Sequence, residues 1–91
     1  MTQPRIETAR QLRKAGYASG RIYGIDTRRI GGATVAERIA LSDAYAERVT
    51  ALLPTGFAML GNGTLWSNAD ADWTLDVDAL VSAAQSAAFA A

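Results

Sequence analysis

Small and apolar residues recur at alternating spacings of four and three along the middle of the chain, as expected for an amphipathic helix. The stripe consists of Val35, Ile39, Ser42, Ala46, Val49 and Leu53. Thr34 followed by Glu37 forms a capping box, in which each side chain satisfies a free amide at the start of the helix. Pro54 and Gly56 end it. The pattern predicts a central core helix over about 35–53.

Helix signals also bound residues 4–15. Pro4 suits a first helical position, because its missing amide hydrogen is not needed there, and Gly16 suits a left-handed cap at the end. The following segment, 16–33, holds five of the eight glycines. Within it, the alternation of apolar and other residues over 21–25 predicts a short strand in an otherwise irregular loop.

A β-hairpin is predicted downstream of the core helix. The segments 57–60 and 64–67 flank Gly61, Asn62 and Gly63, and an Asn-Gly pair favours a tight turn because both residues tolerate positive φ. A two-stranded hairpin is only marginally stable alone. We therefore expect it to pack on the core helix or to pair with the short predicted strand.

The last helix is predicted over about 76–89. Thr74 or Asp76 can cap it, and the carboxylates of Asp76 and Asp78 suit its first turn, where the helix dipole favours negative charge. The fold class that follows is α+β. We expect one small domain over residues 1–91, with three helices, one β-hairpin and the short third strand.

Composition makes the expected core thin. Of the 91 residues 49% are apolar, but 19 residues are alanine. A domain of this size buries only a little over ~60% of the surface that its unfolded chain exposes. We expect residues 1–3 and 90–91 to fray, because terminal residues have few partners to hold them.

The absence of cysteine and histidine narrows the chemistry. Without cysteine the chain has neither disulfides nor a thiolate nucleophile, and without histidine it lacks the common transition-metal ligands and proton relays. The serines have no histidine partner, and no GxSxG motif is present. We predict a protein that is not an enzyme, with no catalytic residues and no cofactor.

The acidic run near the C-terminus does not have the spacing of a calcium loop. Counting an EF-hand from Asn68 places Trp73 where glycine is needed and Ala79 where a bidentate acid is needed. Counting from Asp70 places Val81 at that last position. The glycine-rich phosphate-binding patterns are absent as well. The sequence predicts no metal site.

No membrane or export segment is expected. Charged residues interrupt the first fifteen positions, so no signal peptide is predicted. The run 49–69 has no charge but contains Pro54 and several glycines, which are unsuited to a spanning helix. We expect a cytoplasmic protein that does not contact a membrane.

Charge is balanced overall and uneven along the chain. Residues 1–50 carry all nine bases and five acids, a net charge of +4, whereas residues 51–91 carry four aspartates and no base, a net charge of −4. The two halves can neutralise each other in the fold or can form separate surfaces for charged partners.

The first functional hypothesis is a protein-binding module. Tryptophan, tyrosine and arginine are enriched at interface hot spots. The candidate partner-binding residues are Trp73, Asp70, Asp72, Asp76, Asp78 and Phe89. Such a module could be a small inhibitor or adaptor, of the kind that phages or mobile elements encode, whose acidic stretch competes with nucleic acid for a basic groove on a larger complex. The stripe on the core helix is also compatible with a homodimer.

The alternative hypothesis is a small DNA- or RNA-binding regulator that uses loop 17–29. Tyrosines and arginines interleaved in this way can stack on bases and neutralise phosphates. The residues are Tyr17, Arg21, Tyr23, Arg28 and Arg29. The spacing loosely fits a helix-turn-helix with the hairpin as wing. However, Gly20 and Gly24 would destabilise its recognition helix, and the net charge of zero lacks the usual basic excess.

Overall fold

The computed structural model describes residues 4–90 and has the predicted α+β class. Its elements are α1 (Pro4–Lys14), β1 (Ala18–Ile22), α2 (Thr27–Ile30), α3 (Val35–Leu52), β2 (Phe57–Met59), β3 (Thr64–Ser67) and α4 (Val77–Ala90). Of the ends predicted to fray, 1–3 and 90–91, residues 1–3 and 91 lie outside the described residues, and Ala90 is the last residue of α4.

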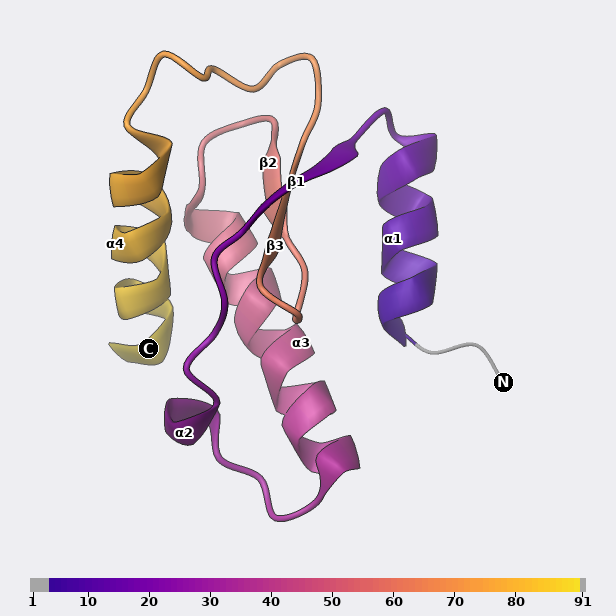
Figure 1. Ribbon diagram of the computed structural model, residues 1–91, viewed down its shortest axis with the longest axis vertical. Helices are drawn as coiled ribbons and strands as arrows, with labels where there is room; N and C mark the ends of the chain where they lie inside the picture. The colour runs from indigo at the N-terminus through magenta and orange to yellow at the C-terminus, as the bar shows by residue number, and fades with distance from the viewer. Residues whose placement is uncertain (1–3, 91) are drawn as a thin grey trace.

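The three strands form one antiparallel sheet in the order β1-β3-β2, so that the short third strand pairs with the hairpin. Figure 1 shows α1 and α4 on opposite sides of the strands, with α3 running beneath them. In the hairpin, alternate residues face opposite sides: Phe57 and Met59 belong to the buried core beside α3 and α4, whereas Ala58 and Trp66 face α1. The architecture therefore has three layers: α1, the three-stranded sheet, and the pair formed by α3 and α4.

The hairpin turn is as predicted, with one difference in its backbone. Gly63 donates its N–H to the carbonyl of Leu60 at 2.9 Å, and the Asn62 side chain accepts from the N–H of Thr64 at 3.0 Å. Within the turn 61–63 only Gly63 has a positive φ, +84°. Asn62 does not, and every other positive φ among the described residues also belongs to a glycine. The turn therefore uses the conformational freedom of glycine, and Asn62 contributes its side-chain oxygen instead.

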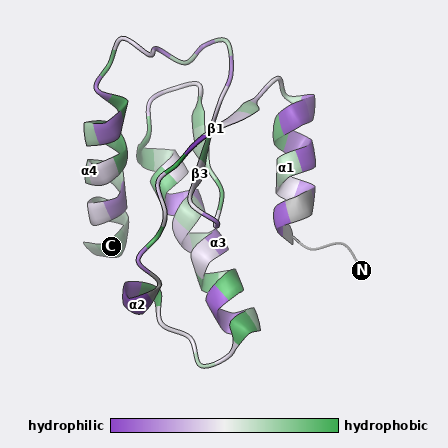
Figure 2. Ribbon diagram, viewed as in Figure 1, coloured by the Kyte–Doolittle hydropathy of each residue, from purple (hydrophilic) through white to green (hydrophobic). Residues whose placement is uncertain are grey.

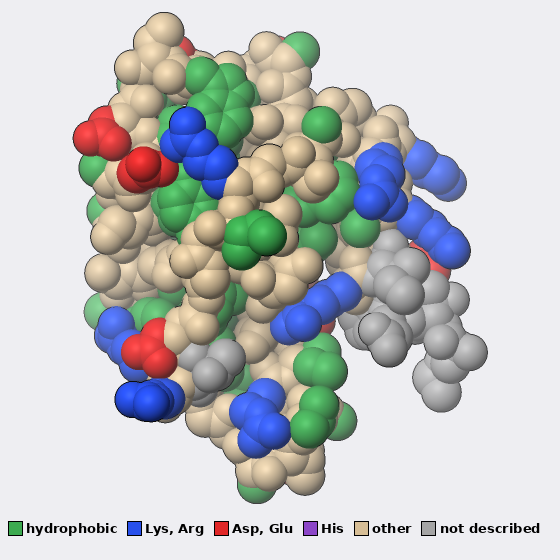
Figure 3. All heavy atoms as spheres, viewed as in Figure 1, with side chains coloured by type: hydrophobic (Ala, Val, Ile, Leu, Met, Phe, Trp, Pro, Cys, Tyr) green, Lys and Arg blue, Asp and Glu red, His purple; other side chains and the backbone are tan. Residues whose placement is uncertain are grey.

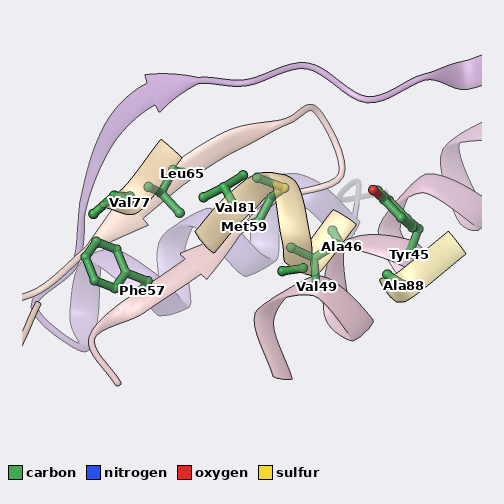
Figure 4. Close-up of a cluster of buried hydrophobic side chains, with 10 residues drawn as sticks. Tyr45, Ala46, Val49, Phe57, Met59, Leu65, Val77, Val81 and Ala88 are labelled. Atoms are coloured by element: carbon green, nitrogen blue, oxygen red, sulfur yellow. The ribbon is translucent and has the colours of Figure 1, made fainter. Parts of the chain in front are cut away.

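The core lies between the sheet and the pair α3 and α4. Figure 4 shows side chains from β2, β3, α3 and α4 meeting in one cluster. Its members are Tyr45, Ala46, Val49, Phe57, Met59, Leu65, Val77, Val81, Ala84 and Ala88. Alanines supply three of the ten positions, which let the two helices approach closely but bury little apolar surface.

The prediction that the whole stripe of α3 is core was wrong for its first two turns. Val35 and Ile39 are 63% and 37% exposed, whereas Ala46 and Val49 are buried. Figure 2 shows hydrophobic residues at this end of α3, away from the strands. The helix begins at the predicted capping box, in which Glu37 donates its N–H to the Thr34 hydroxyl at 3.1 Å. The capping residues therefore set the length of α3. How much of α3 is buried depends on how far the small sheet extends along it, and the sheet does not cover the first two turns.

The helix-turn-helix interpretation of the N-terminal half was wrong. The residues that would form its recognition helix lie in β1 and the loop after it, and the next helix, α2, has only four residues. Gly20 lies against the carbonyl oxygen of Leu65, so that even a Cβ there would be only 3.2 Å away. The glycines therefore suit strand and loop backbone that packs closely on β3.

Candidate functional site

A β-bulge in β1 directs the side chains that build the candidate site. Ser19 pairs with Trp66 and Ile22 pairs with Thr64, so three steps along β1 match two steps along β3. Ser19 and Ile22 consequently lie on the same face of the sheet, although simple alternation would separate them. The extra residue turns Arg21 and the following Tyr23 toward α4.

Arg21 and Tyr23 meet Asp78 in the first turn of α4. The Arg21 guanidinium donates to Asp78 Oδ1 at 2.9 Å, and the Tyr23 hydroxyl donates to the same oxygen at 2.7 Å. Asp78 is presented there because Val77 and Val81 occupy the buried face of α4. The cluster therefore joins residues 55 and 57 positions apart in the chain.

The loop before α4 is shaped by its own aspartates. Asp76 accepts a hydrogen bond from the N–H of Ala79 at 3.1 Å and so caps α4, which selects between the two predicted caps. Asp72 accepts from the N–H of Thr74 at 3.0 Å and from its hydroxyl. These bonds hold the segment that carries Trp73 in a defined path.

Trp73 lies on top of this cluster and is 46% exposed. Its ring meets the ring of Phe57 edge-on at 5.2 Å between centroids, and the Arg21 guanidinium lies 5.3 Å from its centroid. Both contacts hold the indole in place while leaving about half of it open to solvent. Trp73 is thus a fixed, exposed aromatic residue.

Two shallow depressions meet at the Arg21–Asp78 pair. One is lined by Tyr23 and by the exposed side of α4, and the other by Trp73 and Leu75. Leu75 is 41% exposed, and Ile22, which also lines the first depression, is 79% exposed. Figure 3 shows hydrophobic side chains around adjacent basic and acidic ones on this face, over β1 and the start of α4. We call Ile22, Trp73 and Leu75, together with the Arg21–Asp78 pair, the Trp73 face.

The hydrogen bonds of the site fix its charge states. The hydrogen bond from Tyr23, with the positive charge of Arg21, lowers the pKa of Asp78 below its ordinary value. The hydrogen bonds from Thr74 lower the pKa of Asp72 in the same way. Burial, followed by the hydrogen bond to Asp78, raises the pKa of Tyr23. At neutral pH the site therefore holds two carboxylates and a neutral phenol.

We expect the contribution of Asp78 to stability to be lost in acid. A carboxyl group with a lowered pKa in the folded state stabilises the fold above its unfolded pKa of about 4, and this stabilisation disappears as pH falls through the folded pKa. In Tyr23→Phe the strongest cause is removed, so the pKa of Asp78 should rise toward its ordinary value. Carbon-detected NMR titration of the Asp78 carboxyl measures its pKa in the parent protein and in Tyr23→Phe. An unchanged pKa in Tyr23→Phe, with Tyr45→Phe as the control hydroxyl deletion, would contradict the assigned cause.

The charges of the two halves of the chain stay largely apart. Within residues 4–90, only the Arg21–Asp78 ion pair joins the basic half to the acidic half. Arg5 pairs with Asp43 at 2.8 Å, and Arg10 lies 3.8 Å from Glu7, both within the first half. The excess negative charge of the second half therefore remains on the surface of the loop before α4.

The remaining candidate residues lie away from this cluster. Phe89 is stacked on Tyr45 at 4.3 Å between ring centroids, and the Arg29 guanidinium lies 4.1 Å from its ring centroid, near the end of α4. Arg28 is exposed in α2, and Tyr17 is half-buried between α1 and β1. The structure thus brings together Arg21, Tyr23, Asp78 and Trp73, which come from both hypotheses, and leaves the other arginines and Phe89 elsewhere.

Sequence reasoning missed Ile22 and Leu75 as surface residues. An apolar residue in a short alternating segment is expected to be half-buried, but β1 is an edge strand whose five residues are all exposed. Leu75 has no sequence signal of its own, because its exposure depends on how the loop before α4 crosses the sheet.

Residues 4–90 contain no group of three or more acidic, cysteine or histidine side chains placed to hold a metal ion. Of the helices in the same range, none combines the length and the apolar character that crossing a membrane requires.

Comparison with known proteins gave no relative: no family model, no curated protein and no solved structure matches this chain.

Proposed function

We propose that the protein is a non-enzymatic protein-binding module, an inhibitor or adaptor that acts by occupying a surface on a larger complex through the Trp73 face. The observation that carries this proposal is the exposure of three large apolar side chains around one satisfied ion pair. Trp73, Leu75 and Ile22 are 46%, 41% and 79% exposed. Exposed apolar residues gathered with an aromatic anchor are characteristic of protein interfaces.

The state of the arginines supports a protein partner over a nucleic acid. Phosphate binding needs cations that are free to replace counterions. The charge of Arg21 is compensated by Asp78 at 2.9 Å, and Arg29 lies over the ring of Phe89 at 4.1 Å. Two of the three arginines of the alternative hypothesis therefore already have partners within the chain, and Arg21 lies beside the acidic loop.

The experiment is capture of partners from cell lysate with the tagged full chain, before and after nuclease treatment. We expect a protein to remain bound after nuclease. Trp73→Ala should weaken its binding by about tenfold or more, as for a hot-spot residue. Leu52→Ala is the matched control, because Leu52 is 54% exposed at the C-terminal end of α3 and lines neither depression of the Trp73 face. Loss of all bound material with nuclease, or equal losses in both variants, would contradict the proposal.

A further inference from the structure

We infer that the Trp73 face fits a basic protein surface, in which lysine or arginine side chains surround an apolar pocket. This inference rests on the proposed function and specifies the chemistry of its partner. It is carried by the combination of an exposed, fixed indole with uncompensated negative charge on the same loop.

The charge around Trp73 is strongly one-sided. Four carboxylates belong to this loop and the first turn of α4, and Arg21 is the cation that approaches them. Arg21 neutralises Asp78, so Asp70, Asp72 and Asp76 remain without an ion pair among the described residues. All three are exposed. A partner of opposite sign is attracted over a distance of about 8 Å at physiological salt.

The local structure makes this negative surface rigid as well as charged. Oδ1 of Asp72 accepts from Thr74, and Oδ1 of Asp76 accepts from Ala79, so neither aspartate is a free-moving side chain. Trp73, between them, is held by Phe57 and Arg21. A pre-organised surface loses less conformational entropy when it binds, so that more of its contact energy appears as affinity.

The exposed apolar side chains of this surface require apolar contacts on the partner in addition to positive charge. Trp73 and Leu75 line the same depression beside Arg21 and Asp78. A basic surface without an apolar pocket would leave the indole in water. An apolar pocket rimmed by acids would be repelled by the carboxylates of Asp70, Asp72 and Asp76, which have no ion pair among the described residues. Nucleic acid carries negative charge along its whole backbone and is disfavoured for the same reason.

The test is an NMR titration of the isotope-labelled full chain with a synthetic peptide that alternates arginine and leucine. We expect chemical-shift changes concentrated at residues 68–78 and at the indole N–H of Trp73. A peptide that alternates glutamate and leucine and a short DNA duplex should leave those signals unmoved. Changes spread evenly over the chain, or equal changes with the acidic peptide or the DNA, would overturn the inference.

The charge contribution is isolated by a triple variant, Asp70→Asn, Asp72→Asn and Asp76→Asn. Asparagine keeps the side-chain oxygen that caps α4 and accepts from Thr74, so the loop retains its hydrogen bonds while losing its charge. We expect affinity for the arginine peptide to fall by about tenfold.

The matched control removes three negative charges elsewhere. The variant Glu7→Gln, Asp26→Asn and Glu47→Gln changes net charge by the same amount on α1, α3 and the segment before α2. It should bind the arginine peptide nearly as the parent does, and an equal loss in both triple variants would overturn the inference. If lysate capture depends on Trp73 but not on the three aspartates, the proposed function stands and the basic partner is excluded.

Discussion

Replacing Leu65 by alanine should lower the free energy of unfolding by about 3 kcal/mol, the middle of the range for a buried leucine truncated in a packed core. Leu65 is 1% exposed and lies in β3, the central strand, where it faces both α3 and α4 through the shared core. The residues around it belong to three separate elements and cannot all move inward, so a cavity should remain. Because the free energy of unfolding of a small domain is only about 5–10 kcal/mol, this single change should remove a large share of it.

Urea denaturation followed by tryptophan fluorescence measures the effect. Leu52→Ala is the matched control: it deletes the same atoms from a side chain that is 54% exposed, and we expect a change within about 0.5 kcal/mol. Similar losses in the two variants would mean that the core is not where the structure places it.

Replacing Gly56 by alanine should be nearly as damaging, for a different reason. Gly56 has φ +93°, and a Cβ built on it would lie 2.5 Å from the backbone nitrogen of Ala71 and 2.7 Å from the carbonyl carbon of Asp70. The positive φ costs about 1 kcal/mol for alanine. Displacing the backbone at 70–71 adds to it, and we expect a total loss of roughly 3 kcal/mol.

Gly16 provides the matched control for this prediction. Its φ is +90°, nearly that of Gly56, but nothing lies within 4 Å of an added Cβ. Gly16→Ala should therefore lose only the backbone contribution of about 1 kcal/mol. Urea denaturation measures the free energy of unfolding of both variants, and the difference between them is the cost of the close approach between residue 56 and the backbone at 70–71. Equal losses would show that this backbone moves aside at no cost and would contradict the prediction. Because Trp73 follows this contact by two residues, Gly56→Ala should also weaken partner binding.

Local sequence signals predicted most of the secondary structure. The capping box at Thr34 and Glu37 placed the start of α3, and the turn around Asn62 and Gly63 placed the hairpin. Both are interactions within four residues of chain, so they need no knowledge of the rest of the fold. The predicted start of the last helix at Asp76 depended on the same kind of contact.

The position of strand β1 could not be predicted from neighbouring residues alone. Its predicted range was 21–25, whereas the observed strand is Ala18–Ile22. Apolar alternation favoured the later residues, but pairing with β3 and the bulge between Ser19 and Ile22 decided the register. Small residues such as Ser19 and Gly20 carry almost no hydrophobic signal, so pairing that involves them is not visible in the pattern of apolar positions.

The candidate site was predicted residue by residue but not as a site. Trp73 and Asp78 were assigned to a protein interface, and Arg21 and Tyr23 to a nucleic-acid interface. The structure joins these four residues into one cluster, because the bulge in β1 turns Arg21 toward α4. Composition could not distinguish the hypotheses, because an unpaired arginine and one that pairs with a carboxylate 57 positions away look the same in sequence.

The sequence alone determined the α+β class, the starts of the three long helices, the hairpin and the uneven distribution of charge, because these follow from neighbouring residues and from counting. Tertiary structure alone decided which end of α3 is buried and which face of β1 carries Arg21. It also decided that three of the four carboxylates in residues 51–91 have no ion pair within residues 4–90 and stay exposed on the segment that carries Trp73. These outcomes depend on the reach of a three-stranded sheet and on contacts between distant segments. A side chain acquires its partner, its burial and its pKa only when the chain has brought those segments together.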